Sequence, residues 1–230
     1  MNKHITTRPK TGAAAATTVH NASQRRRWAL MSLGAVMLLI GLLFSQVAQA
    51  NDAVGPRVRL ATNMGDIVLE LDAKAAPKTV ANFIRYVNEK HYDGTIFHRV
   101  IDGFMIQGGG YTPDMQQKPT LPPIENEAAE ILARGGPRND VGTIAMARTQ
   151  DPHSATAQFY INVAKNSFLD FQAKTMRGYG YAAFGRVVEG MEIVNAIKKL
   201  PTGPSPAVPR SFPRDVPQET VIIKNATLEK

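Results

Sequence analysis

Short runs of alternating apolar and polar residues, each ended by a turn signal, constrain the fold of this chain more than any other feature. Such alternation is typical of a strand that buries one face. RVRLATN and DIVLELD are separated near Met64-Gly65, and TIFHRVI and FMIQ are separated by Asp102-Gly103, a favoured hairpin pair. The same pattern predicts four further strands, in GTIAMAR (from Gly142), QFYINV (from Gln158), YAAFGRVV (from Tyr181) and ETVIIKNATL (219–228).

Two segments have the period of a helix instead. PKTVANFIRYVNEK begins with Pro77, which suits the first position of a helix, and MEIVNAIKKL (191–200) places its apolar residues on one face. Residues 201–217 hold six of the 15 prolines, which predicts neither a regular helix nor a central strand there. The sum, about eight strands and two helices, predicts a mainly β domain: a closed or nearly closed antiparallel sheet with a helix packed at each opening.

The first 50 residues differ in charge from the rest of the chain. They contain six basic residues and no acidic one, whereas residues 51–230 contain 21 basic and 19 acidic residues. The formal net charge of +8 therefore comes mainly from residues 1–50. Binding to a phosphate backbone needs an excess of basic residues on the folded domain, so we expect no nucleic-acid partner.

The same 50 residues have the order of an export signal. The basic cluster 25–27 precedes the apolar run 28–44, and Ala48-Gln49-Ala50 forms a small-x-small cleavage site. We therefore expect cleavage after Ala50, which leaves a periplasmic domain of residues 51–230. The long polar segment ahead of the apolar run leaves one alternative open, an uncleaved anchor that holds the domain at the inner membrane, facing the periplasm. Because the chain has no cysteine, disulfides are excluded and the hydrophobic core must hold the fold.

Residues 51–230 show no pattern typical of bond-breaking chemistry. A metal site is not predicted, because the histidines occur without an HExxH pair and without cysteine; they are His91, His98 and His153. The glycines 108–110 follow a predicted strand and open no helix, so they match no phosphate-binding loop. A solvated edge is predicted for the nearby carboxylates Glu125, Glu127 and Glu130.

One arginine stands among apolar and aromatic residues, in FHRVIDGFMIQGGG (97–110). Alternation places Met105 and Gln107 on one face of their strand, and Gln158 and Tyr160 on one face of theirs. A strict two-residue hairpin at Asp102-Gly103 would put Arg99 on the face opposite Gln107. A shared site therefore requires a longer turn or a bulge.

Four segments of the chain resemble the successive signatures of the cyclophilin-type peptidyl-prolyl cis-trans isomerases. They are FHRVIDGFMIQGG, GTIAMAR, SATAQFYINVAKNSFLD and YAAFGRVVEGMEIV, and the resemblance runs from about Val58 to Leu228 in the family's order and spacing. It implies a closed eight-stranded antiparallel β-barrel capped by two α-helices, with the active groove on the outer surface of the barrel. It also implies the exported bacterial branch, since Phe168 stands where the best-known eukaryotic members carry tryptophan.

The resemblance assigns roles to residues of this chain. Arg99 matches the catalytic arginine of the family. The substrate-binding positions are matched by Phe104, Met105, Gln107, Ala147, Arg148, Gln158, Tyr160, Phe168, Leu169 and Tyr181. Four of these depart from the common residue: Arg148 replaces asparagine, Tyr160 phenylalanine, Phe168 tryptophan and Tyr181 histidine. The departures imply weaker binding of cyclosporin, and the added hydroxyl of Tyr160 is expected to bond to water or to Gln158.

The implied activity is the isomerisation of X–Pro peptide bonds during the folding of exported proteins, with no metal and no cofactor. Arg99 would donate a hydrogen bond to the proline nitrogen when the peptide bond is twisted. The partners would be unfolded or partly folded polypeptides that contain proline, and a monomer is expected. Two alternatives from other classes are a non-catalytic module that binds proline peptides and a scaffold attached to the membrane through residues 1–50.

Overall fold

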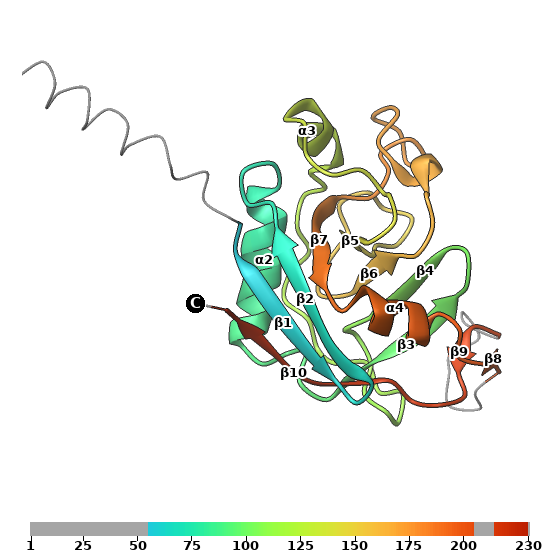
Figure 1. Cartoon of the computed structure of the whole chain (residues 1–230). Helices are drawn as coiled ribbons and strands as arrows, with labels where there is room; N and C mark the ends of the chain where they lie inside the picture. Colours follow the sequence, from blue (N-terminus) through green and yellow to red (C-terminus); the bar gives the residue numbers. More distant parts are fainter. Residues whose placement is uncertain (1–54, 205–213, 230) are drawn as a thin grey trace, which may run out of the picture. The chain divides into compact units, whose positions relative to one another are not determined.

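Eight antiparallel strands close into a barrel in the order β1-β10-β3-β4-β6-β5-β7-β2 (Figure 1). The computed structural model describes residues 55–204 and 214–229. The barrel confirms the predicted fold class, and its strands follow the predicted segments closely. They are β1 (Arg57–Thr62), β2 (Gly65–Leu71), β3 (Thr95–Ile101), β4 (Met105–Gly108), β5 (Thr143–Met146), β6 (Phe159–Asn162), β7 (Ala183–Glu189) and β10 (Ile222–Leu228).

Alternation along the strands separates the barrel interior from its outer face. In β1, Val58 and Leu60 are fully buried, while Arg59 lies between them on the outer face and pairs with Asp66 and Glu229. Each strand contributes its inward residues to one continuous hydrophobic core. Aromatic rings fill much of this core, and the Phe83 ring lies 5.2–5.7 Å from those of Phe159 and Phe184.

Helix α2 (Pro77–Asn88) packs on the barrel, and its N-terminal end is capped by a residue from far along the chain. Val80, Phe83 and Val87 recur at helical spacing and are buried, as the period predicts. Its first backbone amides have no capping side chain of their own; instead the carboxylate of Glu127 accepts hydrogen bonds from the amides of Lys78 and Thr79. Glu127 is only 4% exposed, so its prediction as part of a solvated edge was wrong. Glu125 and Glu130 are exposed, as predicted.

The second predicted helix is α4 (Met191–Ile197), which buries Val194 and Ile197 and lies beside β2. The structure adds short elements that the periodicity did not predict: α3 (Ala128–Ala133), the 3-10 turn η1 (Ser167–Leu169), and the two-residue strands β8 (Thr202–Gly203) and β9 (Val216–Pro217). β8 and β9 pair only with each other, so the described part of the proline-rich segment 201–217 contains neither a helix nor a barrel strand. These elements lie between barrel strands and leave the closure of the barrel unchanged.

The predicted leader, residues 1–50, lies outside the described residues, as does its cleavage site. Within residues 55–204 and 214–229, the longest helix is too short and too polar to span a lipid bilayer.

Candidate active site

The turn between β3 and β4 brings Arg99 to the same face as Gln107. Ile101 pairs with Met105, so the turn has three residues, and Gly103 adopts the left-handed conformation (φ 74°) that such a turn requires. A bulge at His98 shifts the register further along β3. Arg99 therefore lies directly opposite Gln107, and residues opposite each other in an antiparallel pair project from the same face. Of the two alternatives, a longer turn or a bulge, the longer turn brings Arg99 to this face, because the bulge lies beyond Arg99 on the side away from the turn.

The row continues from Gln107 across three more strands. Gln107 pairs with Tyr160 of β6, Tyr160 with Ala145 of β5, and Ala145 with Ala183 of β7. The intervening residues of these strands belong to the barrel interior; Ile106, Ile144 and Ile161 are fully buried there. One outer face of five strands thus carries the row that begins at Arg99.

A second hydrophobic cluster lies on this outer face, separate from the barrel core. We call it the outer apolar cluster: Met105, Ala145, Tyr160 and Ala183, with Ile101, Phe104, Ala147, Leu169 and Tyr181 packed partly buried against it. Six of these nine residues were predicted to bind substrate. The four central residues are almost fully buried, and the five around them are partly exposed. Partly exposed apolar side chains next to an arginine are suited to bind a small apolar ring such as that of proline.

The hydroxyl of Tyr160 faces away from this surface. It donates a 2.8 Å hydrogen bond to Oδ1 of Asn139, and Tyr160 is 4% exposed, so burial raises its pKa well above the ordinary value. The expectation of water or Gln158 as its partner was wrong, since the partner is Asn139. This residue lies in a loop 21 residues away in sequence. The ring of Tyr160 can therefore form an apolar floor.

Asn139 also holds the wall of the cluster. Its Nδ2 donates to the carbonyl oxygens of Leu169 and Tyr181 and to the carboxylate of Asp170, at 3.1–3.3 Å. One buried amide thus joins the floor at Tyr160 to the wall at residues 169–181. Sequence periodicity missed Asn139, since it lies in a loop without regular pattern.

Two glutamines lie side by side at the edge of the site. Nε2 of Gln107 donates to Oε1 of Gln158 at 3.0 Å. A side chain at Gly110 would place its Cβ 2.4 Å from Cγ of Gln158, so the last glycine of the run 108–110 makes room for this pair. The glycine run therefore shapes the site.

Arg148 is bound to the loops around it. Its guanidinium donates to the carbonyl oxygens of Gly180, Thr149 and Gln150, and its Cζ lies 4.5 Å from the centre of the Tyr181 ring. The amide of Ala147 donates to the carbonyl of Gln158, within the barrel ladder. The arginine at position 148 thus supports the loop and the Tyr181 ring.

Phe168 forms the exposed rim of the site. It is 64% exposed and stacks on Phe104, with ring centres 5.9 Å apart. The turn η1 presents it next to Leu169, which packs on the outer apolar cluster. All eleven predicted site residues are therefore in the row, in the outer apolar cluster, or in contact with one of these.

One charged residue of the site carries no signal in the sequence. Nε of Arg99 forms an ion pair with Oδ2 of Asp215 at 3.4 Å, and the two side chains are 30% and 32% exposed. Asp215 lies in the proline-rich segment, 116 residues from Arg99. No local pattern in that segment signals its contact with β3.

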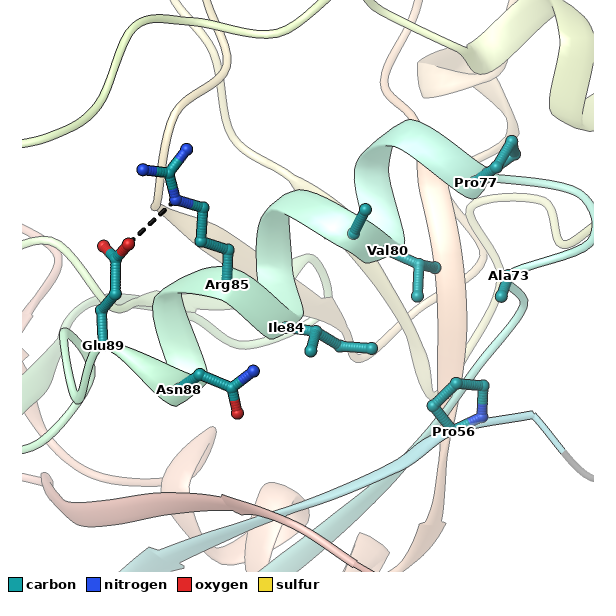
Figure 2. Close-up of a pocket in the computed structure, with 9 residues that line it drawn as sticks. Pro56, Ala73, Pro77, Val80, Ile84, Arg85, Asn88 and Glu89 are labelled. Atoms are coloured by element: carbon teal, nitrogen blue, oxygen red, sulfur yellow. Dashed lines mark hydrogen bonds and ion pairs between the residues drawn. The ribbon is translucent and has the colours of Figure 1, made fainter.

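Two other features of the described residues lie outside the site. A groove of about 520 Å³ follows α2, lined among others by Pro56, Val80 and Ile84 and bordered by the Arg85–Glu89 ion pair (Figure 2). None of the predicted site residues lines it. Within residues 55–204 and 214–229, no group of three His, Asp or Glu side chains could hold a metal ion.

The family model and the relatives that match this chain are those of peptidyl-prolyl cis-trans isomerases. The family model "Cyclophilin type peptidyl-prolyl cis-trans isomerase/CLD" matches residues 57–228. Peptidyl-prolyl cis-trans isomerase cyp18 of Streptomyces antibioticus is 59% identical over 171 residues, which cover 74% of this chain and 97% of the relative. Peptidyl-prolyl cis-trans isomerase A of Dickeya dadantii is 46% identical over 202 residues, which cover 86% of this chain and 97% of the relative.

Among solved structures, a cyclophilin-type isomerase of Cryptosporidium parvum, crystallised in the presence of the dipeptide Ala-Pro, superposes with a TM-score of 0.53 and 25% identity. The superposition covers 76% of this chain and 99% of that chain.

Proposed function

The chain belongs to the cyclophilin-type peptidyl-prolyl cis-trans isomerases and is an enzyme that isomerises X–Pro bonds, and from this premise we propose that Arg99 is its catalytic residue. Arg99 donates a hydrogen bond to the proline nitrogen as the peptide bond twists. The outer apolar cluster holds the proline ring while this happens.

The reaction needs no bond to be broken. Delocalisation of the nitrogen lone pair into the carbonyl gives the peptide bond a rotational barrier of about 18–20 kcal/mol. At the midpoint of rotation this delocalisation is lost, and the lone pair is localised on nitrogen, where it can accept a hydrogen bond. A donor that meets this lone pair only in the twisted state lowers the barrier without binding the ground state more tightly.

Arginine has the chemistry for this donor. Its guanidinium is planar, stays charged at any working pH and cannot act as a base. Arg99 is 30% exposed and stands at the end of the row that crosses the outer apolar cluster, so water is partly excluded around it. Hydrogen bonds to a developing acceptor are stronger in such a partly dry site.

The observation that carries the proposal is the register of β3 on β4. It sets the guanidinium on the face that bears Met105 and Tyr160, the two largest side chains at the centre of the outer apolar cluster. The Gln107–Gln158 pair adjoins both and offers amide groups to the peptide on either side of proline. The presence of the dipeptide Ala-Pro with the Cryptosporidium protein supports a proline-containing peptide as the substrate.

The test compares two variants of Arg99 with a matched control. Loss of one transition-state donor typically lowers the rate by about a hundredfold to a thousandfold, so we expect Arg99→Ala to reduce kcat/KM by at least about a hundredfold. Arg99→Lys should recover little, because an ammonium lacks the planar fork. The control is Arg85→Ala on α2, where the exposed arginine pairs with Glu89 outside the site. Near-normal turnover of a folded Arg99→Ala protein on short X–Pro peptides would refute the role of Arg99.

The proposed setting is the periplasm, with exported polypeptides as substrates. The support is the order of charged, apolar and small residues in 1–50. The alignment with the Dickeya relative covers 86% of this chain, whereas residues 57–230 make up only about three quarters of it. The alignment therefore also includes residues ahead of β1. Of the two alternatives, a non-catalytic module is not favoured, because the curated relatives compared above are named isomerases. The N-terminal residue of the mature protein and its release by osmotic shock distinguish the cleaved form from the membrane-attached form.

A further inference from the structure

The ion pair between Arg99 and Asp215 joins two distant parts of the chain at the active site. Nε of Arg99 lies 3.4 Å from Oδ2 of Asp215, and each side chain is about two thirds buried. A carboxylate has only acceptor positions and matches the N–H groups of a guanidinium. The contact is therefore directed at the Nε edge of the arginine.

The backbone of Asp215 is fixed against β3. Its carbonyl oxygen accepts a 2.7 Å hydrogen bond from the amide of Val100, the neighbour of Arg99. The two residues that follow, Val216 and Pro217, are buried and form β9, which pairs with β8. The carboxylate thus extends from a segment that is tied to the strand on which Arg99 stands.

Asp215 and Gln107 approach Arg99 from opposite edges of β3. Successive amides of a strand point to opposite edges; Arg99 pairs with Gln107 on the β4 edge, and the amide of Val100 bonds to Asp215 on the other. In the planar guanidinium the Nε–H bond runs parallel to an N–H bond of one Nη group, so a carboxylate at Nε lies beside that group and directs the second Nη group toward the other side. That other side is the side of β4, where the outer apolar cluster begins at Met105.

We propose that Asp215 is a positioning residue of the isomerase, which fixes the plane of the Arg99 guanidinium so that the Nη group on the side away from Asp215 faces the proline nitrogen. The inference rests on the proposed catalytic role of Arg99. An arginine side chain has many rotamers, and ordering it during the reaction would cost conformational entropy. The ion pair orders it before substrate arrives, which is the advantage of a preorganised donor.

The charge of Asp215 also suits this reaction. The target is a neutral nitrogen, so the direction of the N–H donor matters more than a net positive charge. A carboxylate beside Nε offsets the charge of the guanidinium, while the Nη group on the far side keeps its N–H donors. Asp215 therefore orients Arg99 and at the same time reduces the net positive charge that would favour acidic peptides.

The experiment is a double-mutant cycle in the purified full chain. We expect Asp215→Ala to lower kcat/KM on a short X–Pro peptide by about tenfold, mainly through kcat, since a misplaced donor loses most of its transition-state contact. In the Arg99→Ala background, the same substitution should change kcat/KM by less than about twofold. Asp66→Ala is the matched control, because Asp66 of β2 pairs with Arg59 of β1 at 3.1 Å, outside the site.

A spectroscopic readout separates positioning from a general loss of structure. The 15N–1H resonance of the Arg99 Nε group, identified as the one missing in Arg99→Lys, should shift in Asp215→Ala and remain unchanged in Asp66→Ala. Circular dichroism and the melting temperature report whether each variant is folded. If Asp215→Ala does not fold, Asp215→Asn, which keeps the size of the side chain, takes its place in the cycle with the same expectations.

The outcomes distinguish this inference from the proposed function. If Arg99→Ala is nearly as active as wild type, the catalytic role of Arg99 is wrong, whatever Asp215 does. If Arg99→Ala is inactive but substitution of Asp215 changes nothing, or lowers kcat/KM by the same factor in both backgrounds, then Asp215 does not act through Arg99 and the inference is overturned.

Discussion

Acid should destabilise this barrel through one buried histidine, His98. It is the bulged residue of β3, is 1% exposed, and its ring lies 4.6 Å from that of Tyr111. Burial lowers the pKa of His98 from 6.5 to about 4, and the nearby charge of Arg99 acts in the same direction. The folded protein therefore holds this ring neutral at a pH where the unfolded chain protonates it.

The sign and size of the effect follow from linkage. Above pH 6.5 neither state binds the proton and stability is unaffected. As the pH falls below 6.5, the unfolded state gains a proton that the folded state does not, so the free energy of unfolding decreases by about 1.4 kcal/mol per pH unit. The decrease ends near pH 4, where the folded state is protonated too. The total is about 3 kcal/mol, a large part of the usual stability of a domain.

The assay is urea unfolding of wild type and His98→Gln at several values between pH 7.5 and pH 4.5. Circular dichroism is the suitable probe, because the only tryptophan of the chain, Trp28, lies in the predicted leader. The buried His91 also has a lowered pKa, through burial and the charge of Lys118, so the quantity to compare is the difference between the two proteins. That difference should change by about 2–3 kcal/mol over this range.

A variant of a second histidine, outside the core, serves as the control. His153→Gln removes an exposed histidine and should keep the pH dependence of wild type. If wild type and His98→Gln lose stability in parallel as the pH falls, the folded protein protonates His98 readily and the reasoning from burial is wrong.

The remaining predictions concern the leader and the pocket. The mature protein should begin at Asn51, be released by osmotic shock and show no tryptophan fluorescence; full-length protein with activity in the membrane fraction would favour the anchor. Tyr160→Phe leaves Oδ1 of Asn139 with one donor fewer, so we expect a loss of about 1–2 kcal/mol in unfolding free energy and turnover within about threefold of wild type. Phe168→Trp enlarges the exposed rim and should strengthen cyclosporin inhibition by about tenfold or more, about 1.4 kcal/mol, as measured by inhibitor titration; equal inhibition of both proteins would contradict this account of the rim.

The barrel could be predicted from sequence because its strands carry local signals. Alternation in β1 and β2, the Asp-Gly turn before β4 and the helical period of α2 each depend on neighbours within a few residues. The errors arose where the deciding contact is distant. Glu127 was predicted to be solvated, yet it caps α2 from 48 residues away, and no local pattern distinguishes it from Glu125 or Glu130.

The candidate site was likewise predictable only where the signal was local or came from the family resemblance. The resemblance to a family supplied the eleven candidate residues, and alternation alone supplied only that Met105 shares a face with Gln107, and Gln158 with Tyr160. Whether Arg99 joins that face depended on the length of one turn, which local propensity leaves open. Its partner Asp215 lies in a proline-rich segment without periodicity, so only the folded structure reveals it.

What the reaction demands of the fold is a fixed distance between a donor and a ring-binding surface on different strands. Arg99 stands on β3, whereas the four central residues of the outer apolar cluster lie on β4, β6, β5 and β7, and each adjoining pair of these strands is held by an antiparallel ladder. Closure of the barrel leaves these strands no free edge along which to slide. The side chains then need support only at their ends, where Asp215 contacts Arg99 and Asn139 contacts Tyr160. Because both supporting residues lie in loops outside the barrel strands, substitutions there should alter turnover or local stability while leaving the barrel closed.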